Sequence, residues 1–487
     1  MEWKKLLSIE TQVEREEEPE VFKKYPVGDL EKDYKSIITS AAFRRLQDKT
    51  QVFPLDKSDF VRTRLTHSIE VSTIARQLGI MVTKNKSSYL PEEFKKGGEL
   101  VERIPSILSC AGLLHDIGNP PFGHFGEVII GEWFKNEFVK ETFTYKGKKI
   151  EAMLDGQMKS DLENFEGNAQ ALRILSKIKN KHEGYDANLT YGVLCTLIKY
   201  PTSSNEFDGN SDDLKKHKLG YYCAENETMR VICDNTGTRL ENEYIRHPLV
   251  FLLEAADDIA YSTADLEDAL KKRLFSIDEF VEFYEKKADK ITNISQKRYS
   301  CELLEDLKGR LKVNNRSTEA DMAAFQKWME YVKKWLMYAA AFRFSKSYKD
   351  IMEGKYKYDL FYDTNHQETI KILKKSMIEF VFDSREILKL ELSAKRIISS
   401  LLDDFVYAVL YWEDGHSNEE KVYTPNKADK KLINIISTNY KEDYLQAKSD
   451  DDAKNLYLRL LMVTDFISGM TDSYAKNIYQ EINGLTK

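Results

Sequence analysis

The sequence predicts a mainly α-helical fold with one small β-hairpin. Only 22 glycines and 10 prolines occur in 487 residues. Apolar side chains recur at spacings of three and four residues, which is the period of an amphipathic helix. A chain of this length can form two or three domains, or one helical domain with large additions. We therefore expect an all-α architecture with a sizeable buried core.

Six stretches before residue 275 carry the helical pattern, and a long helical series follows them. They are residues 34–47, 67–83, 104–117, 168–179, 189–200 and 247–273. The clearest strand signal is GYYCAENETMRVICD at 220–234, where we expect the hairpin. Polar breaks at 84–98, 145–150 and 201–213 are predicted to be loops.

We divide the chain into an N-terminal segment (1–30), a helical core (31–275) and a C-terminal helical region (276–487). The boundary near residue 275 rests on the polar stretch 285–320, which we interpret as a partly ordered junction between two halves. No internal repeat or low-complexity tract is visible.

The composition argues against a membrane-spanning protein and against a general binder of nucleic acid or acidic membranes. The formal net charge is -7, and hydrophobic residues make up 42% of the chain. No apolar run approaches the length that crosses a bilayer, so we expect no membrane span. A general binder of nucleic acid or acidic membranes usually carries a basic excess, so binding to single-stranded DNA gains no support. A polyanionic substrate must therefore meet a local basic pocket.

The N-terminus and the cysteines predict a cytoplasmic protein. The first residues, MEWKKLLSIETQVEREEEPE, contain no apolar core of an export signal. The five cysteines are scattered, odd in number and free of any CxxC pair, which indicates neither a disulfide framework nor a thiolate zinc site. We expect them to be reduced and structural.

Three of the eight histidines, His67, His115 and His124, fall within 58 residues. Spacings of four, three and four residues place His67 on the apolar face of its predicted helix, so the imidazole is expected to be buried. His115 and Asp116 end the apolar helix IPSILSCAGLLHDIG. This clustering of potential ligands favours a metal site.

A further ligand candidate comes from HPLVFLLEAADDIAYSTADLEDA (247–269), where Asp257, Tyr261 and Asp265 continue an apolar stripe at every fourth position. A buried carboxylate is costly without a partner, and a metal ion or a buried base would compensate it. Two histidines with Asp116 and Asp257 form a mixed nitrogen and oxygen set suited to Mn, Fe, Mg, Ni or Zn, with coordination positions left open for catalysis.

Each of these features has a structural alternative when taken alone. A His-Asp dipeptide at a helix end is more often structural, and a lone buried histidine such as His67 usually satisfies a core hydrogen bond. Asp257 or the adjacent Asp258 would then cap a helix or pair with a lysine. The combination of all these features favours the metal site.

Six segments together resemble the deoxyguanosine triphosphate triphosphohydrolases, a branch of the HD-domain superfamily. They are AFRRLQDKTQVFP (42–54), RTRLTHSIEVSTIAR (62–76), LLHDIGNPPFGHFGE (113–127), FEGNAQALRIL (165–175), LIKYP (197–201) and HPLVFLLEAADDIAYSTADLEDA (247–269). The resemblance covers most of residues 31–275, and DFISGMTDSYA (465–475) is also similar to that family. It implies an HD-domain helical core with a C-terminal helical extension.

The resemblance implies a divalent metal ion, Mn, Mg or Fe, held by His67, His115, Asp116 and Asp257. For the last ligand it favours Asp257 over Asp258. It also implies that His124 and Glu127 form a catalytic pair, in which the carboxylate raises the imidazole pKa and fixes its orientation. The alternative for His124 is a turn residue without chemical function.

Substrate contacts are carried over from the same resemblance. A lone basic side chain is usually a solvated surface charge, so these residues depend on their motifs. Phosphate contacts are expected from Arg64, Lys199 and Lys218, with Asn119 a further candidate. Tyr261 is expected at the phosphates, and Gln51 and Asp265 at the sugar.

The implied reaction converts a deoxynucleoside triphosphate, with dGTP preferred, into deoxynucleoside and tripolyphosphate. Metal-activated water attacks the α-phosphorus while His124 protonates the departing 5′-oxygen. Helical relatives of this type form homo-oligomers. Two alternatives stay open: an HD phosphohydrolase of a nucleoside monophosphate or an alarmone, and a non-catalytic protein that binds nucleotide or single-stranded DNA.

Overall fold

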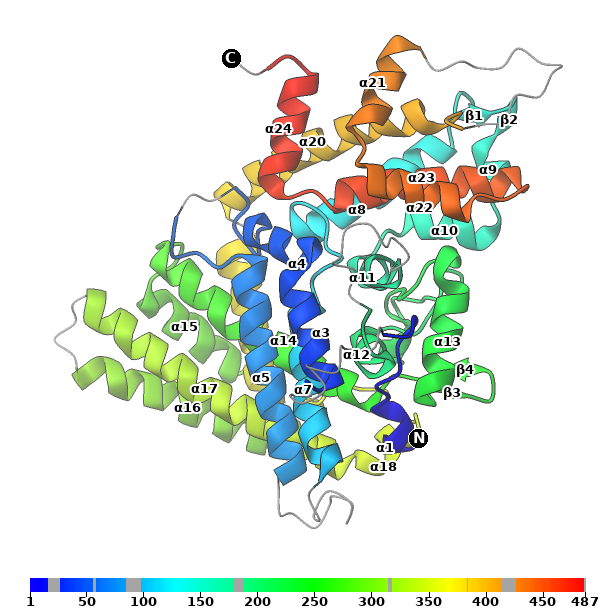
Figure 1. Cartoon of the computed structure of the whole chain (residues 1–487). Coiled ribbons are helices and arrows are strands. Elements are labelled where there is room, and N and C mark those ends of the chain that lie inside the picture. Colours follow the sequence, from blue (N-terminus) through cyan, green and yellow to red (C-terminus); the bar gives the residue numbers. More distant parts are fainter. Residues whose placement is uncertain are drawn as a thin grey trace.

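The computed structural model describes residues 1–15, 27–55, 58–84, 98–177, 188–313, 318–382, 384–413 and 426–485. Helices dominate these residues, which confirms the predicted mainly α-helical fold (Figure 1). Strands in the described part of the chain form two short antiparallel hairpins rather than one. They pair β1 (Thr144–Tyr145) with β2 (Lys148–Lys149), and β3 (Arg239–Leu240) with β4 (Glu243–Tyr244).

The larger layer is built around α5 (Arg64–Lys84), α7 (Glu99–Leu114) and α14 (Pro248–Lys271). Helix α5 packs along both α7 and α14, and α17 (Thr318–Lys346) packs against α5 and α14. The other helices with residues in this layer are α1 (Trp3–Leu6), α3 (Asp29–Thr39), α4 (Ala41–Arg45), α11 (Gly167–Ser176), α12 (Tyr191–Leu197), α13 (Asn226–Thr236), α15 (Ile277–Ala288), α16 (Ile294–Val313), α18 (Tyr348–Met352) and α19 (Gln367–Met377).

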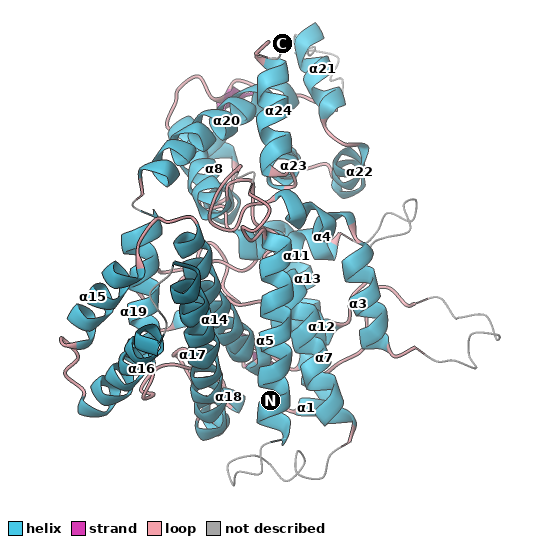
Figure 2. Ribbon diagram, turned by 90° about the vertical axis from the view of Figure 1, so that its left-hand side faces the viewer, coloured by secondary structure: helices cyan, strands magenta, loops and turns pink. Residues whose placement is uncertain are grey.

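The smaller layer contains α8 (Gly123–Phe138), α20 (Arg385–Val409) and α23 (Asp452–Ser468), and α20 packs against both α8 and α23. Its other helices are α9 (Ile150–Met153), α10 (Gly156–Glu163), α21 (Lys427–Ile435), α22 (Thr438–Ala447) and α24 (Asp472–Ile482). Figures 1 and 2 both place the C-terminal helices together at one end of the molecule, away from the N-terminus.

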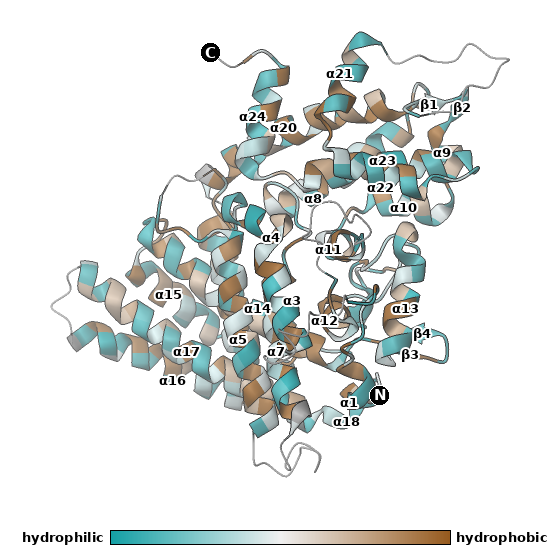
Figure 3. Cartoon of the chain, viewed as in Figure 1, coloured by the Kyte–Doolittle hydropathy of each residue, from teal (hydrophilic) through white to brown (hydrophobic). Residues whose placement is uncertain are grey.

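Two apolar cores underlie these layers. The larger core joins side chains from Trp3 to Ile387. The smaller core joins residues between Phe122 and Tyr222 with residues between Ala394 and Ile478. The outer helices α21 and α24 show polar and apolar colours on the same ribbon, as expected for helices with one buried face (Figure 3). The domain boundary at residue 275 stays a prediction.

The ends of the six predicted helices differ from those in the structure. The stretch 34–47 is interrupted at Ser40, whose backbone is extended and whose Oγ accepts a hydrogen bond from the Phe43 amide at 3.2 Å. A serine cap of this kind starts a new helix, so α3 and α4 are separate. The other five predicted helices correspond to α5, α7, α11, α12 and α14.

The predicted hairpin at 220–234 is wrong. A short 3-10 turn (Cys223–Glu225) leads there into α13, which ends at Gly237 with a left-handed φ of 68°. Met229, Ile232 and Cys233 are buried on one side of α13, at helical spacing. The aromatic and β-branched composition of the segment gave a strand signal, but tertiary packing of this face decides for the helix.

The polar stretch 285–320 is not a partly ordered junction where the structure describes it. It contains the end of α15, all of α16 and the start of α17, with residues 314–317 outside the described part. Leu303, Leu307 and Leu311 are buried at spacings of four, so one apolar stripe holds α16 in place despite its polar composition.

The predicted loop at 201–213 lacks helices and strands, as expected. The predicted loop at 145–150 is wrong in most of its length, because it contains the end of β1, all of β2 and the start of α9, with only Lys146 and Gly147 in the turn. Residues 85–97 of the third predicted loop lie outside the described residues. The five cysteines are unpaired. None of the helices in the described ranges combines the length and apolar character that a membrane span requires.

Candidate active site

Two buried histidines from neighbouring helices face each other. His67 lies in the first turn of α5, and His115 directly follows the last residue of α7. Both side chains are completely buried, and their ring centroids are 5.3 Å apart. His115 Nδ1 lies 2.8 Å from the Gly112 carbonyl oxygen. A carbonyl only accepts, so Nδ1 is the donor, and Nε2 of a neutral ring is left as a bare ligand atom.

Asp257 of α14 completes a compact donor group with these rings. Its Oδ1 lies 3.3 Å from His67 Nε2 and 3.4 Å from His115 Nε2. The three ligand atoms lie within 4.8 Å of one another. Asp116 Oδ2 lies 3.5 Å from His115 Nε2, at the edge of this group. The structure thus brings all four predicted metal ligands to one place, with His67, His115 and Asp257 in the closest arrangement.

The charges of this group suit a cation. Burial alone would raise the pKa of Asp257, but Lys199 and His115 outweigh it and hold the pKa well below its ordinary value. The pKa of Asp116 is likewise lowered despite burial, by His115 and Arg64. Both groups are therefore carboxylates at neutral pH. These carboxylates in turn raise the pKa of His115 against the effect of its burial. A divalent metal ion would take the place of the proton on the imidazole nitrogen, so two carboxylates and two imidazoles are a fitting ligand set for it.

Two cations lie against these carboxylates. Arg64 Nη1 donates to Asp116 Oδ2 at 2.6 Å, and Lys199 Nζ donates to Asp257 Oδ2 at 2.8 Å. Asn119, which we predicted as a phosphate contact, donates through Nδ2 to Asp116 Oδ1 at 2.7 Å. The arginine and lysine predicted to bind phosphate therefore line the same group as the predicted ligands.

The choice between the two adjacent aspartates follows from the turn of α14. Asp258 points to α19, where its Oδ1 lies 2.7 Å from Lys374 Nζ. Asp257, one residue earlier, faces the two histidines. Neighbouring residues on a helix are rotated by about 100°, so only one of the two can face the cluster.

His124 and Glu127 form a hydrogen-bonded pair in the first turn of α8. His124 Nδ1 lies 2.7 Å from Glu127 Oε2. The His124 side chain is 76% exposed, whereas that of Glu127 is 7% exposed. The hydrogen bond that His124 donates to Glu127 raises the pKa of His124 above its ordinary value. The buried carboxylate therefore orients an accessible imidazole and favours its protonated form.

Gly167, at the start of α11, connects the two parts of the site. Its backbone amide donates to Glu127 Oε1 at 2.9 Å. A Cβ atom at this position would lie 2.2 Å from Asn119 Oδ1 and 2.6 Å from Glu127 Oε1. Only glycine allows Asn119, which holds Asp116, and Glu127, which holds His124, to approach the same backbone. The predicted ligands and the His124 pair are thus neighbours.

Lys218 lies close to the His124–Glu127 pair, and its charge acts on the His124 imidazole. Its Nζ is 3.0 Å from Glu166 Oε2, and Asn168 Nδ2 donates to Glu166 Oε1 at 2.7 Å. Glu166, Gly167 and Asn168 were not predicted as site residues from the sequence. The only signal was their position in the segment FEGNAQALRIL, where an acid, a glycine and an amide precede an apolar helix.

The three remaining predicted residues have fewer contacts. Gln51 Oε1 is buried without a hydrogen-bond partner among the described residues. Tyr261 stacks on Phe382, with ring centroids 6.4 Å apart and planes 12° apart. Asp265 is buried, its Oδ2 has no hydrogen-bond partner in the described chain, and burial raises its pKa to about 7. The structure does not join these three to the ligand cluster by any hydrogen bond among described residues.

One family model and several known proteins are similar to this chain. The HD domain family model matches residues 64–216. The chain is 41% identical to a deoxyguanosinetriphosphate triphosphohydrolase-like protein of Listeria monocytogenes, over 100% of both chains. It is 33% identical to a deoxyguanosinetriphosphate triphosphohydrolase of Enterobacter sp. (strain 638), over 93% of both chains. It is 31% identical to a deoxyguanosinetriphosphate triphosphohydrolase-like protein of Synechocystis sp., over 100% of both chains.

The chain belongs to the deoxyguanosinetriphosphate triphosphohydrolase family. The HD domain match contains His67, His115, Asp116 and His124 but ends before Asp257. The relatives match along nearly the whole chain, so the similarity also includes α14 and the C-terminal helices.

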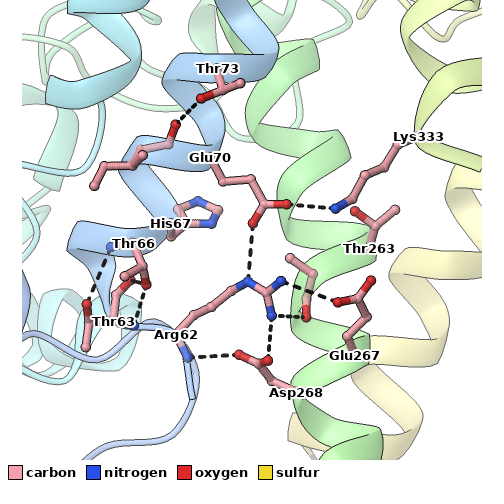
Figure 4. Close-up of polar contacts among 12 residues, drawn as sticks. Arg62, Thr63, Thr66, His67, Glu70, Thr73, Thr263, Glu267, Asp268 and Lys333 are labelled. Carbon is pink, nitrogen blue, oxygen red and sulfur yellow. Dashed lines mark hydrogen bonds and ion pairs between the residues drawn. The ribbon is translucent and has the colours of Figure 1, made fainter. Parts of the chain in front are cut away.

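In this member of the deoxyguanosinetriphosphate triphosphohydrolase family, a buried charge network holds the start of α5 against α14. The Arg62 amide donates to Asp268 Oδ2 at 2.9 Å, and Arg62 Nε lies 3.2 Å from Glu70 Oε2. Glu267 Oε2 lies 3.4 Å from Arg62 Nη2. Lys333 Nζ of α17 donates to Glu70 Oε1 at 2.8 Å. Figure 4 shows the His67 ring beside this network, on the helix that carries Glu70.

We expect Arg62→Met to destabilise the protein, because it leaves the largely buried Asp268 and Glu267 without their arginine. Removing one partner of a buried ion pair typically costs about 3 kcal/mol or more. Urea unfolding followed by circular dichroism measures the change. Arg230→Met is the matched control, since Arg230 forms only exposed ion pairs with Glu227 and Asp234, and should change stability little. Equal midpoints for Arg62→Met and wild type would contradict the prediction.

Proposed function

We propose that this protein is a metal-dependent deoxynucleoside triphosphate triphosphohydrolase that prefers dGTP and releases deoxynucleoside and tripolyphosphate. One observation carries the proposal: the His67, His115 and Asp257 donor group is connected to the His124–Glu127 pair through Asp116, Asn119 and Gly167. A ligand group beside an accessible imidazole suits hydrolysis better than binding alone. The names of the relatives supply the substrate class and the preferred base.

The proposed metal ligands are His67, His115, Asp116 and Asp257, and the proposed ion is Mn, Mg or Fe. The bare Nε2 of His115 and the two ionised carboxylates fit such an ion. A divalent ion bound there supplies Lewis-acid activation of water and withdraws charge from the phosphoryl group.

The proposed phosphate contacts are Arg64, Lys199 and Lys218. Arg64 and Lys199 now neutralise Asp116 and Asp257. A triphosphate beside these carboxylates would share the same cations, which offset its charge. The further proposed contacts are Asn119 and Tyr261 at the phosphates, and Gln51 and Asp265 at the sugar.

His124 is the proposed general acid. Its exposed ring is within reach of a ligand, and Glu127 fixes the Nδ1 side so that Nε2 faces outward as the proton donor. Water attacks the α-phosphorus and gives up a proton to the solvent, the bond from phosphorus to the 5′-oxygen breaks, and His124 transfers its proton to that oxygen and regains one from the solvent. Glu127 holds the imidazole through this transfer.

We expect Glu127→Gln to move the alkaline limb of the pH–rate profile to lower pH. Glu127 raises the pKa of His124, and an acid loses its proton as the pH rises through its pKa. Without the carboxylate the His124 pKa falls, so the rate falls at a lower pH, and the maximum rate is reduced by less than in His124→Ala. Single-turnover rates from pH 5 to pH 10 measure the shift. An unchanged alkaline limb would show that Glu127 does not control His124.

The proposed function is tested by incubating all four dNTPs with metal-loaded protein and resolving the products by ion exchange. We expect deoxynucleoside and tripolyphosphate, fastest from dGTP, no turnover in excess EDTA and recovery with Mn²⁺. GTP should react far more slowly than dGTP, because a closed sugar pocket excludes the 2′-hydroxyl. Orthophosphate from a monophosphate, pyrophosphate from an alarmone, or binding without turnover would replace the proposal.

The proposal also places the protein in the cytoplasm as a homo-oligomer. The acidic net charge of -7 gives binding to single-stranded DNA no support.

A further inference from the structure

The C-terminal motif DFISGMTDSYA (465–475) has no role in the mechanism above, yet it contains two buried aspartates. Asp472 is 1% exposed. Its Oδ1 accepts from the Phe122 amide at 2.9 Å, and its Oδ2 accepts from the Thr50 amide at 3.0 Å and from the Thr50 hydroxyl. A buried carboxylate with three donors from distant segments joins those segments firmly.

The turn that Asp472 holds is a strained one. Phe122 has a left-handed φ of 63°, and Gly123 follows with a φ of 62°. A left-handed backbone is unfavourable for phenylalanine and persists only where surrounding contacts enforce it. His124 comes directly after this turn, in the first turn of α8. The bond from the Phe122 amide to Asp472 therefore helps to fix the direction in which His124 leaves the backbone.

A second contact joins the motif to the same loop. The buried Lys49 donates to the Asn119 carbonyl oxygen at 2.6 Å and to the Ser468 carbonyl oxygen at 2.7 Å. Asn119 and Phe122 are the two ends of the Pro-Pro turn before α8. The motif thus holds this turn at both ends, through Lys49 and through Asp472.

Asp465, the first residue of the motif, holds α11, the helix whose first residue contacts Glu127. It accepts from Arg173 Nε at 2.7 Å, Arg173 Nη2 at 2.9 Å and Gln170 Nε2 at 2.8 Å, all from α11. The first residue of α11, Gly167, donates its amide to Glu127. Asp465 lies on α23, so these bonds join α23 to α11. Residues 465–475 therefore hold two helices: α8, whose start carries His124 and Glu127, and α11, whose first residue Gly167 donates to Glu127.

We propose that the C-terminal motif positions the general acid of the active site, with Asp472 as the residue that sets the orientation of His124. Asp472 hydrogen-bonds to Thr50 and to the Phe122 amide and to none of the proposed metal ligands, and it acts through the Phe122 amide, so it is a positioning residue. The inference rests on the proposed function. It explains why a segment about 350 residues away in sequence is similar to the family along with the catalytic motifs.

The test is Asp472→Asn, which keeps the size of the side chain but replaces one acceptor oxygen with an NH₂ group that opposes a donor. At saturating dGTP and Mn²⁺ we expect the single-turnover rate to fall about 10-fold, because small errors in the position of a catalytic group are costly. Metal content and the Kd for dGTP should stay near wild type. Ser473→Ala, which loses only an exposed hydrogen bond to Asp48, is the matched control and should keep the full rate.

The decisive comparison repeats Asp472→Asn in the His124→Ala background. If Asp472 acts through His124, the second substitution should lower the rate no further. An equal loss in both backgrounds, or a full rate for Asp472→Asn in the wild-type background, would overturn the proposal. If Asp472→Asn yields too little folded protein, Lys49→Met replaces it, because this substitution removes the bonds that hold the Asn119 end of the turn. The same two outcomes would then overturn the proposal.

A second measurement does not depend on turnover. Histidine NMR of the protein should show that His124 titrates at a lower pH in Asp472→Asn than in wild type, since the bond to Glu127 that raises its pKa is formed less often. An unchanged titration would contradict the positioning role. If wild type fails to hydrolyse dGTP, the proposed function fails, and this titration still decides whether Asp472 orients His124.

Discussion

Replacing His115 with alanine is expected to remove the metal and the activity together. His115 supplies the bare Nε2 that faces Asp257 and Asp116, and its Nδ1 is fixed by the Gly112 carbonyl. Loss of groups that merely orient a ligand typically weakens metal binding 10- to 100-fold, so loss of the ligand should cost more than about 100-fold. Elemental analysis after dialysis, together with a Mn²⁺ titration, measures the loss.

His366→Ala is the matched control for this substitution. His366 is also buried, but it lies among Tyr299 and Trp335, outside the ligand group. It should keep one full complement of metal per folded protein, even where stability falls. Wild-type Mn²⁺ affinity in His115→Ala would remove His115 from the site.

Replacing His124 with alanine is expected to have a different effect, in which metal and substrate still bind but turnover is slow. His124 lies in α8, is hydrogen-bonded to Glu127, and is not a member of the His67, His115 and Asp257 ligand group. General-acid assistance is typically worth about 10² to 10⁴ in rate, so the single-turnover rate should fall by that factor. Metal analysis, dGTP binding and single-turnover kinetics on the same preparation separate the three quantities.

The leaving group offers a control for the His124 prediction. A substrate analogue whose leaving group departs without a proton, such as a 4-nitrophenyl ester of triphosphate, should lose much less rate in His124→Ala than dGTP does. A metal-free His124→Ala protein, or one that hydrolyses dGTP at the wild-type rate, would contradict the role given to His124.

The sequence predicted well those parts of the site that depend on local periodicity. His67 and Asp257 continue apolar helical stripes, and the structure places them together, with His67 completely buried and Asp257 half-buried. His124 and Glu127 are three residues apart at a helix start, so their contact follows from helix geometry once α8 begins at Gly123. The choice of Asp257 over the adjacent Asp258 came from the resemblance, because the spacing of apolar residues did not decide which of the two neighbours faces the site.

Contacts between distant segments could not be predicted in this way. The bonds from Asp472 to Phe122 and Thr50 span 350 and 422 residues, and that from Lys49 to the Ser468 carbonyl spans 419. Periodicity shows that such residues are buried but not which segments meet. The incorrect hairpin at 220–234 has a related cause, since packing of Met229 and Ile232 against the core overrides a local strand preference.

The central claim, attack of water on the α-phosphorus with release of intact tripolyphosphate, is tested most directly by hydrolysis of dGTP in ¹⁸O-labelled water with mass analysis of both products. The account predicts one ¹⁸O atom in the tripolyphosphate and none in the deoxyguanosine. Label in the deoxyguanosine, or labelled orthophosphate or pyrophosphate as the first product, would contradict it.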